Sequence, residues 1–267
     1  MKLERLNEED VKFKGVDHYY NLKQLFNRDD VTYMYENKYK FGNSIGYVSA
    51  LMKRLNPSSV ENAYELYLRS GEEDTYLPPT KRGRSANELE KLAIEWMNEY
   101  GKGDIPLDKF YDALVLHAVV ETYDGFKYEK MAKDMLDDCG FETDWSDDAA
   151  DGKYFVDIIA KKDGVTYFIQ VKPLSFFTAS REHTRRDRVK AFNCMRQAKQ
   201  DFGNIVYKYL IYDKYSGLWV VNENDGRCAF DYDALVAADG TFIGNKNRMI
   251  ANETNNLFNK KKVEDGK

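Results

Sequence analysis

Apolar residues recur every three or four positions along the first third of the chain, which is the period of an amphipathic helix. The pattern predicts helices over 16–26, 45–55 and 60–68, and Asn56-Pro57-Ser58-Ser59 separates the last two. Either serine of that break can cap the third helix. After a proline-containing loop over 77–84, Ser85 and Glu88 form a capping-box pattern that begins another helix.

Further helices are expected over 108–122 and 128–139, and Gly140 ends the latter. The acidic stretch 134–151, which contains no Lys or Arg, is expected to continue as a solvated loop. The helical period therefore dominates the first half of the chain.

Beyond Gly140 the pattern changes to short runs rich in Val, Ile, Tyr and Phe, which are typical of strands. Strands are expected over 154–161, 165–171, 205–212 and 218–221, with Lys162-Asp163-Gly164 as a hairpin turn and a helix over 187–201. The order predicted after residue 126 is helix, strand, strand, strand, helix, strand, strand. This order indicates an α/β fold of the mixed α+β kind, in which helices flank a mixed sheet.

Two regions are expected from this change of period. Residues 1–105 form a helical N-terminal region suited to DNA recognition or dimerisation, and residues 106–267 form the core with the sheet. Residues 245–267 are expected to be a polar helix or tail at the end of that core.

Composition places the chain among globular proteins, since 43% of its 267 residues are hydrophobic and 32% are charged. Its net charge of -5 argues against a protein that coats nucleic acid through overall charge, so any DNA contact must come from local patches. Three widely separated cysteines form no CxxC pair, which disfavours a zinc site or a disulfide framework and fits a reducing cytoplasm. No apolar run is long enough to span a membrane, and the first residues do not resemble a secretory signal.

Three polar side chains interrupt the apolar strands of the predicted hairpin. Asp157 stands between Val156 and Ile158, and Gln170 and Lys172 lie on one face of the next strand because they are two positions apart. A buried carboxylate needs a metal or a cation as its partner. The hairpin is therefore expected to aim all three groups at one place.

Magnesium-assisted phosphodiester hydrolysis would use such a group. Asp157 would supply a carboxylate ligand, Gln170 a side-chain carbonyl and Val171 its backbone carbonyl, while Lys172 would stabilise the attacking hydroxide and the phosphate. The alternative is an ordinary cross-strand ion pair between Asp157 and Lys172, with Gln170 incidental.

This arrangement resembles the PD-(D/E)XK nuclease superfamily, in which an aspartate on one strand is followed by acid-x-lysine on the next. The resemblance covers residues 126–221 and implies a restriction-endonuclease-like core. It also implies that Glu129, on the preceding helix, reaches the metal site. Val156 stands at the motif's proline position, and Gln170 replaces the acid, which removes one negative charge from the site.

Basic residues gather in three places despite the acidic composition, and the third place also holds asparagines. The residues expected to contact DNA lie in these places. They are Lys81, Arg82 and Arg84; Arg181, Arg185, Arg186, Arg188 and Lys190; and Asn245, Asn247 and Arg248 within the polar stretch 244–262. Basic side chains bind phosphates, and Asn and Arg can pair with base edges.

The sequence thus predicts a type II restriction endonuclease that cuts specific double-stranded DNA with Mg²⁺, as a homodimer, in a prokaryotic cytoplasm. Thr80-Lys-Arg-Gly-Arg84 and Val171-Lys-Pro173 are similar to segments of the MjaI-type restriction enzymes. Three alternatives stay open: a repair or junction nuclease of the same superfamily, a nuclease-like protein that binds DNA without cutting it, and a structural domain that binds no metal.

Overall fold

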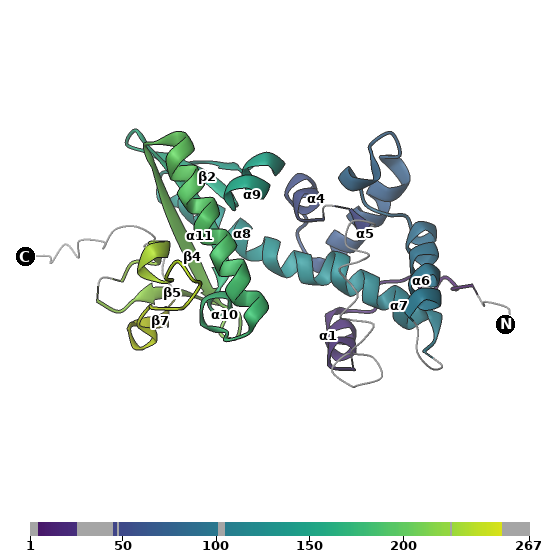
Figure 1. The fold of residues 1–267 in the computed structure, drawn as a ribbon. Helices are drawn as coiled ribbons and strands as arrows, with labels where there is room; N and C mark the ends of the chain where they lie inside the picture. Colours follow the sequence, from purple (N-terminus) through teal and green to yellow (C-terminus); the bar gives the residue numbers. More distant parts are fainter. Residues whose placement is uncertain (1–4, 26–44, 47, 101–104, 225, 253–267) are drawn as a thin grey trace, which may run out of the picture. The chain divides into compact units, whose positions relative to one another are not determined.

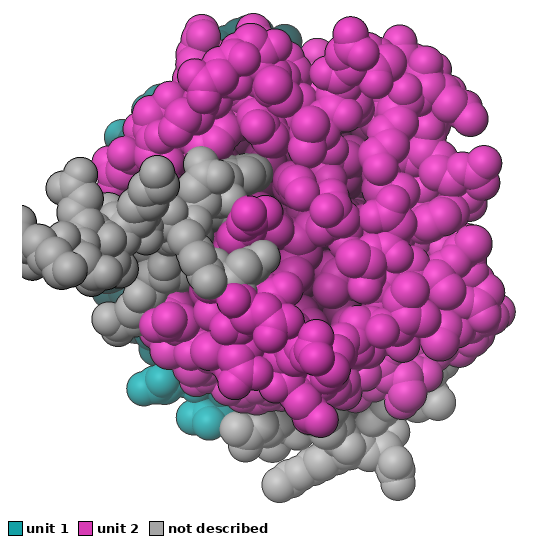
Figure 2. Space-filling model, turned by 90° about the vertical axis from the view of Figure 1, so that its left-hand side faces the viewer, with its two compact units in different colours: residues 1–127 teal, residues 128–267 magenta. Residues whose placement is uncertain are grey.

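The computed structural model describes residues 5–25, 45–46, 48–100, 105–224 and 226–252. Figure 1 shows the fold as a ribbon coloured along the sequence. The chain divides into two compact units, Met1–Lys127 and Tyr128–Lys267. Figure 2 shows one face of the second unit in magenta. The boundary lies 22 residues beyond the expected one at 105/106, because helices α6 and α7, on either side of that position, pack against each other. No described helix combines the length and apolar character that crossing a membrane requires.

Helices build the first unit, as the period of its apolar residues predicts. They are α1 (Val16–Leu25), α4 (Val48–Leu55), α5 (Val60–Glu73), the 3-10 turn η2 (Pro79–Lys81), α6 (Ala86–Tyr100), α7 (Leu107–Val115) and the π-helical turn η3 (Leu116–Val120). Large aromatic side chains fill the interior, among them Tyr19, Tyr67, Trp96 and Tyr111.

Both predicted helix starts are confirmed. The hydroxyl of Ser59 accepts a hydrogen bond from the Asn62 amide at 3.1 Å and caps α5. The Ser85 hydroxyl accepts from the Glu88 amide at 3.3 Å, and Glu88 Oε2 accepts from the Ser85 amide at 3.0 Å. These reciprocal bonds satisfy amides that the first turn of a helix leaves unpaired.

The prediction of separate helices over 108–122 and 128–139 is wrong. α7, η3 and α8 (Glu121–Asp138) follow one another without a break. Gly125 lies within α8, where a glycine costs about 1 kcal/mol relative to alanine. Burial of Val119, Val120 and Phe126 around it outweighs that cost.

The second unit contains a seven-stranded mixed sheet with helices on its faces, which confirms the predicted class. Its elements are β1 (Glu142–Trp145), α9 (Asp148–Tyr154), β2 (Ile158–Lys162), β3 (Val165–Pro173), α10 (Leu174–Thr178), α11 (Glu182–Phe202), β4 (Ile205–Asp213), β5 (Leu218–Asn222), β6 (Ala229–Phe230), the 3-10 turns η4 (Tyr232–Ala234) and η5 (Lys246–Arg248), and β7 (Met249–Asn252). The strand order is β1-β2-β3-β4-β5-β7, and β6 pairs with β4. β2 is antiparallel to both β1 and β3, whereas β3 and β4 are parallel.

Three local assignments need correction. The acidic stretch is not a loop, because it forms the end of α8, the strand β1 and the start of α9. Tyr154 ends a helix rather than beginning a strand, since the Asp147 carboxylate accepts from the Ala150 amide at 2.6 Å and caps α9. α11 begins at Glu182, five residues before its predicted start at 187.

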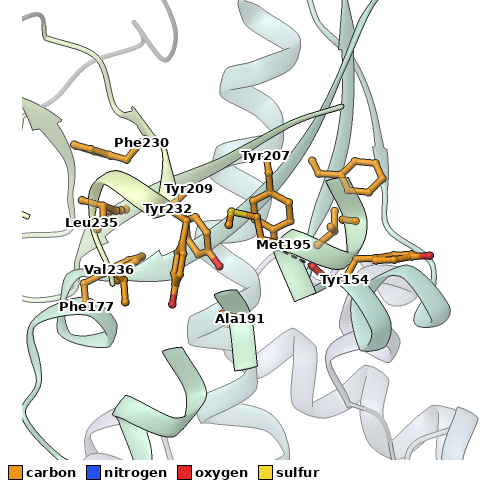
Figure 3. Close-up of a cluster of buried hydrophobic side chains, with 14 of the residues drawn as sticks. Tyr154, Phe177, Ala191, Met195, Tyr207, Tyr209, Phe230, Tyr232, Leu235 and Val236 are labelled. Atoms are coloured by element: carbon orange, nitrogen blue, oxygen red, sulfur yellow. Dashed lines mark hydrogen bonds between the residues drawn. The ribbon is translucent and has the colours of Figure 1, made fainter. Parts of the chain in front are cut away.

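Alternate residues of the strands enter two different cores. Phe168, Tyr207 and Tyr209 belong to one core with Ala191 and Met195 of α11. Figure 3 shows Tyr207, Tyr209, Ala191 and Met195 in this core. The neighbouring strand residues, including Ile158, Ile169, Val171 and Leu210, pack instead with Tyr128, Ala132 and Leu136 of α8. The sheet therefore has an α11 face and an α8 face, and each strand residue can be assigned to one of them by its position.

Candidate active site

The hairpin between β2 and β3 brings Asp157 next to Gln170 and Lys172. Asp163 and Gly164 occupy the two turn positions with φ values of 52° and 75°, as a two-residue type I′ turn requires. The turn sets the register Ile158↔Ile169, and the Asp157 amide continues it by donating to the Ile169 carbonyl at 2.9 Å. The sequence prediction of this hairpin is confirmed.

Among the described residues, one oxygen of the Asp157 carboxylate makes the polar contacts of that side chain. Oδ2 accepts hydrogen bonds from Gln170 Nε2 at 2.6 Å and from the Val171 amide at 2.8 Å, and Lys172 Nζ lies 3.9 Å from it. The Asp157 side chain is buried, so these donors replace the hydration that it loses on folding. The other oxygen, Oδ1, accepts no hydrogen bond from the described residues, which leaves it available to a ligand.

The amide of Gln170 is held in one orientation. Its nitrogen faces the Asp157 carboxylate, since the reverse orientation would place two oxygens in contact. The carbonyl oxygen Oε1 is consequently buried without a hydrogen-bond partner in the described parts of the chain. An unsatisfied acceptor on a side chain only 1% exposed is costly and points to a missing electropositive partner.

Val171 contributes through its backbone. Its N–H points towards Asp157, and the N–H and C=O of a strand residue project to the same side of the strand. The Val171 carbonyl therefore faces the same side as β2. It lies just beyond Ile169, the last residue of β3 that is paired with β2 at this end. The Val171 carbonyl thus lies on the same side of β3 as Asp157.

All three side chains belong to the α11 face of the sheet. Gln170 and Lys172 alternate with Ile169 and Val171, which are buried on the α8 face. Asp157 precedes Ile158, another residue of the α8 face, and so points the other way. The predicted convergence of the three groups is confirmed.

A strained aromatic residue, Phe155, lies beside this group. It caps the end of α9 with φ 59° and ψ 48°, a left-handed conformation that is uncommon for a bulky side chain. The Tyr207 hydroxyl donates to its carbonyl at 2.5 Å, and burial raises the pKa of that hydroxyl well above its ordinary value. Lys172 Nζ lies 5.4 Å from the centre of the Phe155 ring, within cation–π range.

The oxygen set fits magnesium better than it fits a softer metal. Mg²⁺ favours one or two carboxylates together with other oxygens and water. A group of three or more His, Cys, Asp or Glu side chains that could hold a metal is absent from the described ranges. At Asp157, the oxygens that could hold a metal are its own carboxylate, the Gln170 side-chain carbonyl and the Val171 backbone carbonyl.

Glu129 belongs to the helix that precedes the sheet. It lies on α8, whose buried residues Tyr128 and Ala132 pack on the opposite face of the sheet. Its Oε2 is buried. Its role as a metal ligand stays a prediction.

Two residues of the Lys81–Arg84 cluster stabilise the fold instead of facing a ligand. Arg84 is 5% exposed and donates to the carbonyls of Pro79, Arg82 and Gly83. Arg82 forms two hydrogen bonds with the Glu88 carboxylate, at 2.8 and 2.7 Å, which lowers the pKa of Glu88 to about 2. Lys81 alone of these three is exposed.

Arg188 is a second correction. It is 4% exposed, and its guanidinium donates to Gly240 O at 2.6 Å, Phe176 O at 2.9 Å and Ala179 O at 3.0 Å. It therefore fastens α11 to α10 and to the loop around Gly240. A structural arginine and a phosphate-binding arginine cannot be told apart in the sequence, because each is simply a basic residue among other basic residues.

The other predicted DNA contacts are accessible to different extents. Arg181 is exposed, Arg185 and Arg186 share the Glu182 carboxylate, and Lys190 is exposed on α11. Asn245, Asn247 and Arg248 are exposed around η5, where Asn245 Oδ1 accepts from the Asn247 amide. The rest of the predicted polar tail, residues 253–267, lies outside the described residues.

Phe155 is the residue of this region that the sequence does not identify. An aromatic two positions before an aspartate carries no sequence signal, because its contact with Lys172 depends on the left-handed turn out of α9. A search of protein-family models and a search of curated proteins both find no match to this chain.

Proposed function

We propose that this chain is a magnesium-dependent endonuclease that hydrolyses phosphodiester bonds of double-stranded DNA at specific sequences, as type II restriction enzymes do. The observation that carries the proposal is the buried Gln170 Oε1, which lacks a partner among the described residues, beside the Asp157 carboxylate and the Lys172 ammonium. The resemblance of Asp157, Gln170 and Lys172 to the PD-(D/E)XK motif supports it. The second unit also has the predicted fold class, a mixed sheet in which β2 is antiparallel to β1 and β3 and β4 is parallel to β3, with helices on its faces.

The residues of the site divide the chemistry among them. Asp157 Oδ1, Gln170 Oε1 and the Val171 carbonyl would hold Mg²⁺, which neutralises charge on the phosphate and lowers the pKa of bound water. Lys172 would donate to a nonbridging phosphate oxygen and to the attacking water, and so hold the nucleophile in line. Asp157 Oδ2 stays engaged with Gln170 and Val171, which fixes the direction of Oδ1.

Recognition and assembly are further parts of the proposal. Exposed basic residues at Lys81, Arg181 and Arg186 would bind phosphates, and Asn245 and Arg248 would read base edges. The helical first unit would contribute recognition or dimerisation, because cutting both strands of a palindrome requires two sites. Such an enzyme would act in a prokaryotic cytoplasm.

One specific observation favours a second candidate, a nuclease-like protein that binds DNA without cutting it. Gln170 replaces an acid, so the site has one carboxylate where metal-binding sites of this kind commonly have two. The same amide satisfies Oδ2 of Asp157 without any metal. Both candidates would bind DNA, but only the first would hydrolyse it. A repair or junction nuclease would instead prefer branched or damaged duplexes.

The test is digestion of plasmid and phage DNA with and without Mg²⁺ by the native chain, Asp157→Ala and Lys172→Ala. A matched control comes from a strand-borne pair outside the site, Lys208 with Asp231 at 2.9 Å. Discrete magnesium-dependent bands, lost in both site variants and kept in Lys208→Ala, support a site-specific endonuclease. DNA binding without cutting under Mg²⁺ or Mn²⁺ selects the second candidate, and equal cutting by Lys172→Ala refutes the assigned site.

A further inference from the structure

The cations of α11 are not equivalent, because most of them already have partners. Arg185 and Arg186 pair with Glu182, Arg188 donates to three carbonyls, and Lys199 lies 3.9 Å from Asp233. Within the described ranges, Lys190 and Arg196 have no acidic partner. These two keep an uncompensated positive charge at the helix surface.

Lys190 is distinguished by where its charge is held. Its Nζ lies 5.2 Å from the centre of the Phe155 ring, and Lys172 Nζ lies 5.4 Å from the same ring centre. Two ammonium groups from different elements, β3 and α11, thus contact one aromatic side chain. Arg196 stacks on Phe192 at 6.0 Å and has no such link to the site.

The ring that carries both contacts is itself fixed. The Phe155 backbone is held by the end of α9 and by the Tyr207 hydroxyl, and its side chain is half-buried against the α11 core. A fixed ring holds the two ammonium groups in place without neutralising either of them. An anion approaching Asp157 would therefore meet a second, preset positive charge beside Lys172.

We propose that Lys190 is a substrate-positioning residue that binds the phosphate next to the scissile one, with Phe155 setting its place. This proposal rests on the proposed function, since it takes Lys172 as the cation at the scissile phosphate. Lys172 contacts both Asp157 and the ring and serves the reacting phosphate, while Lys190 is exposed and serves its neighbour on the strand. Lysine suits this role because its ammonium is a point charge with three donors that can follow a moving phosphate.

The experiment compares Lys190→Gln and Lys190→Arg with the control Arg196→Gln, all in the full chain. Affinity for a duplex oligonucleotide is measured by fluorescence anisotropy without divalent metal over a series of salt concentrations. Loss of one phosphate contact lowers the slope of log K against log salt by about 0.9, which is roughly an 8-fold loss of affinity at 0.1 M salt. Lys190→Gln should show this loss, and Lys190→Arg and Arg196→Gln should stay within about 2-fold of the native chain.

Magnesium-dependent cleavage gives the second readout. Lys190→Gln should raise KM and leave kcat within a few-fold of the native value, whereas a misfolded variant would melt earlier and lose both. If the native chain binds DNA and Lys190→Gln has the same salt slope as Arg196→Gln, the role of Lys190 is refuted while the nuclease proposal stands. If the native chain neither binds nor cuts duplex DNA, both proposals fail.

Discussion

Replacing Gln170 by glutamate tests whether the site is built for a metal. Gln170→Glu restores the acid of the motif but removes the amide that donates to Asp157 Oδ2 at 2.6 Å. Two carboxylates would then meet at a position where the native side chain is only 1% exposed. Without a cation one of them must hold a proton, as in paired acids elsewhere.

The cost can be worked from the lost contact. A hydrogen bond to a charged group contributes about 1.5–3 kcal/mol, and that contribution disappears once the introduced glutamate is ionised. We therefore expect unit 2 of Gln170→Glu to be less stable by about 2–3 kcal/mol at pH 8 without metal, a fall in Tm of roughly 5–10 °C.

The pH dependence has a definite sign. A carboxyl whose folded pKa is raised by a neighbouring carboxylate binds more protons in the folded state than in the unfolded one, so the stability of the fold falls as pH rises above about 4.3. In its protonated form the introduced carboxyl can donate to Asp157 as the amide does, and the difference from the native chain should largely vanish at about pH 5. Addition of Mg²⁺ at about 100 times its Kd should restore about 2.7 kcal/mol at pH 8.

Thermal unfolding followed by circular dichroism at pH 5 and pH 8, with EDTA or Mg²⁺, measures all three effects. The matched control is Gln197→Glu, since Gln197 donates to Asp201 Oδ1 at 2.7 Å in an exposed position. It should lose little stability and should not respond to Mg²⁺. A Gln170→Glu protein whose Tm matches the native one at pH 8 and ignores Mg²⁺ would refute the metal-site reasoning.

Two further predictions concern the corrected and buried charges. Arg188→Met should lower the free energy of unfolding by about 3 kcal/mol in urea titration, because three carbonyls lose their donor. If this variant instead changed the salt dependence of DNA binding and kept the native stability, Arg188 would be a DNA contact. Asp112→Ala should destabilise unit 1 by about 3 kcal/mol, since the fully buried carboxylate accepts from Lys14 at 2.8 Å and contacts His18 Nε2 at 2.7 Å. Helical circular dichroism in urea measures this second loss, and a midpoint equal to that of Asp108→Ala, which alters a partly exposed pair, would contradict it.

The sequence predicts the structural features that depend on residues close together along the chain. The hairpin, its turn and the shared face of Gln170 and Lys172 follow from a period of two and a two-residue turn. The capping box at Ser85 is equally predictable, since both of its hydrogen bonds form within three residues.

Features that depend on distant packing leave no local signal. The break expected between residues 122 and 128 does not form, because buried residues around Gly125 keep the chain helical. Arg84 and Arg188 carry the same basic signal as surface cations, and only the carbonyls gathered around them show that they are structural. The contact of Lys190 with Phe155 joins two helices through a left-handed residue, which no pattern along the chain reveals.

The two-residue turn between β2 and β3 has a consequence for the order in which the site assembles. Asp157 and Gln170 are 13 positions apart, so their hydrogen bond closes a short loop within a single hairpin. Such hairpins form in about 1–10 μs, faster than parallel pairing such as that of β3 with β4, which must wait for the intervening helix. We therefore expect the carboxylate and its amide to meet early in refolding, before α11 delivers Lys190. Pulsed hydrogen exchange should protect the Asp157 and Val171 amides ahead of those of β4.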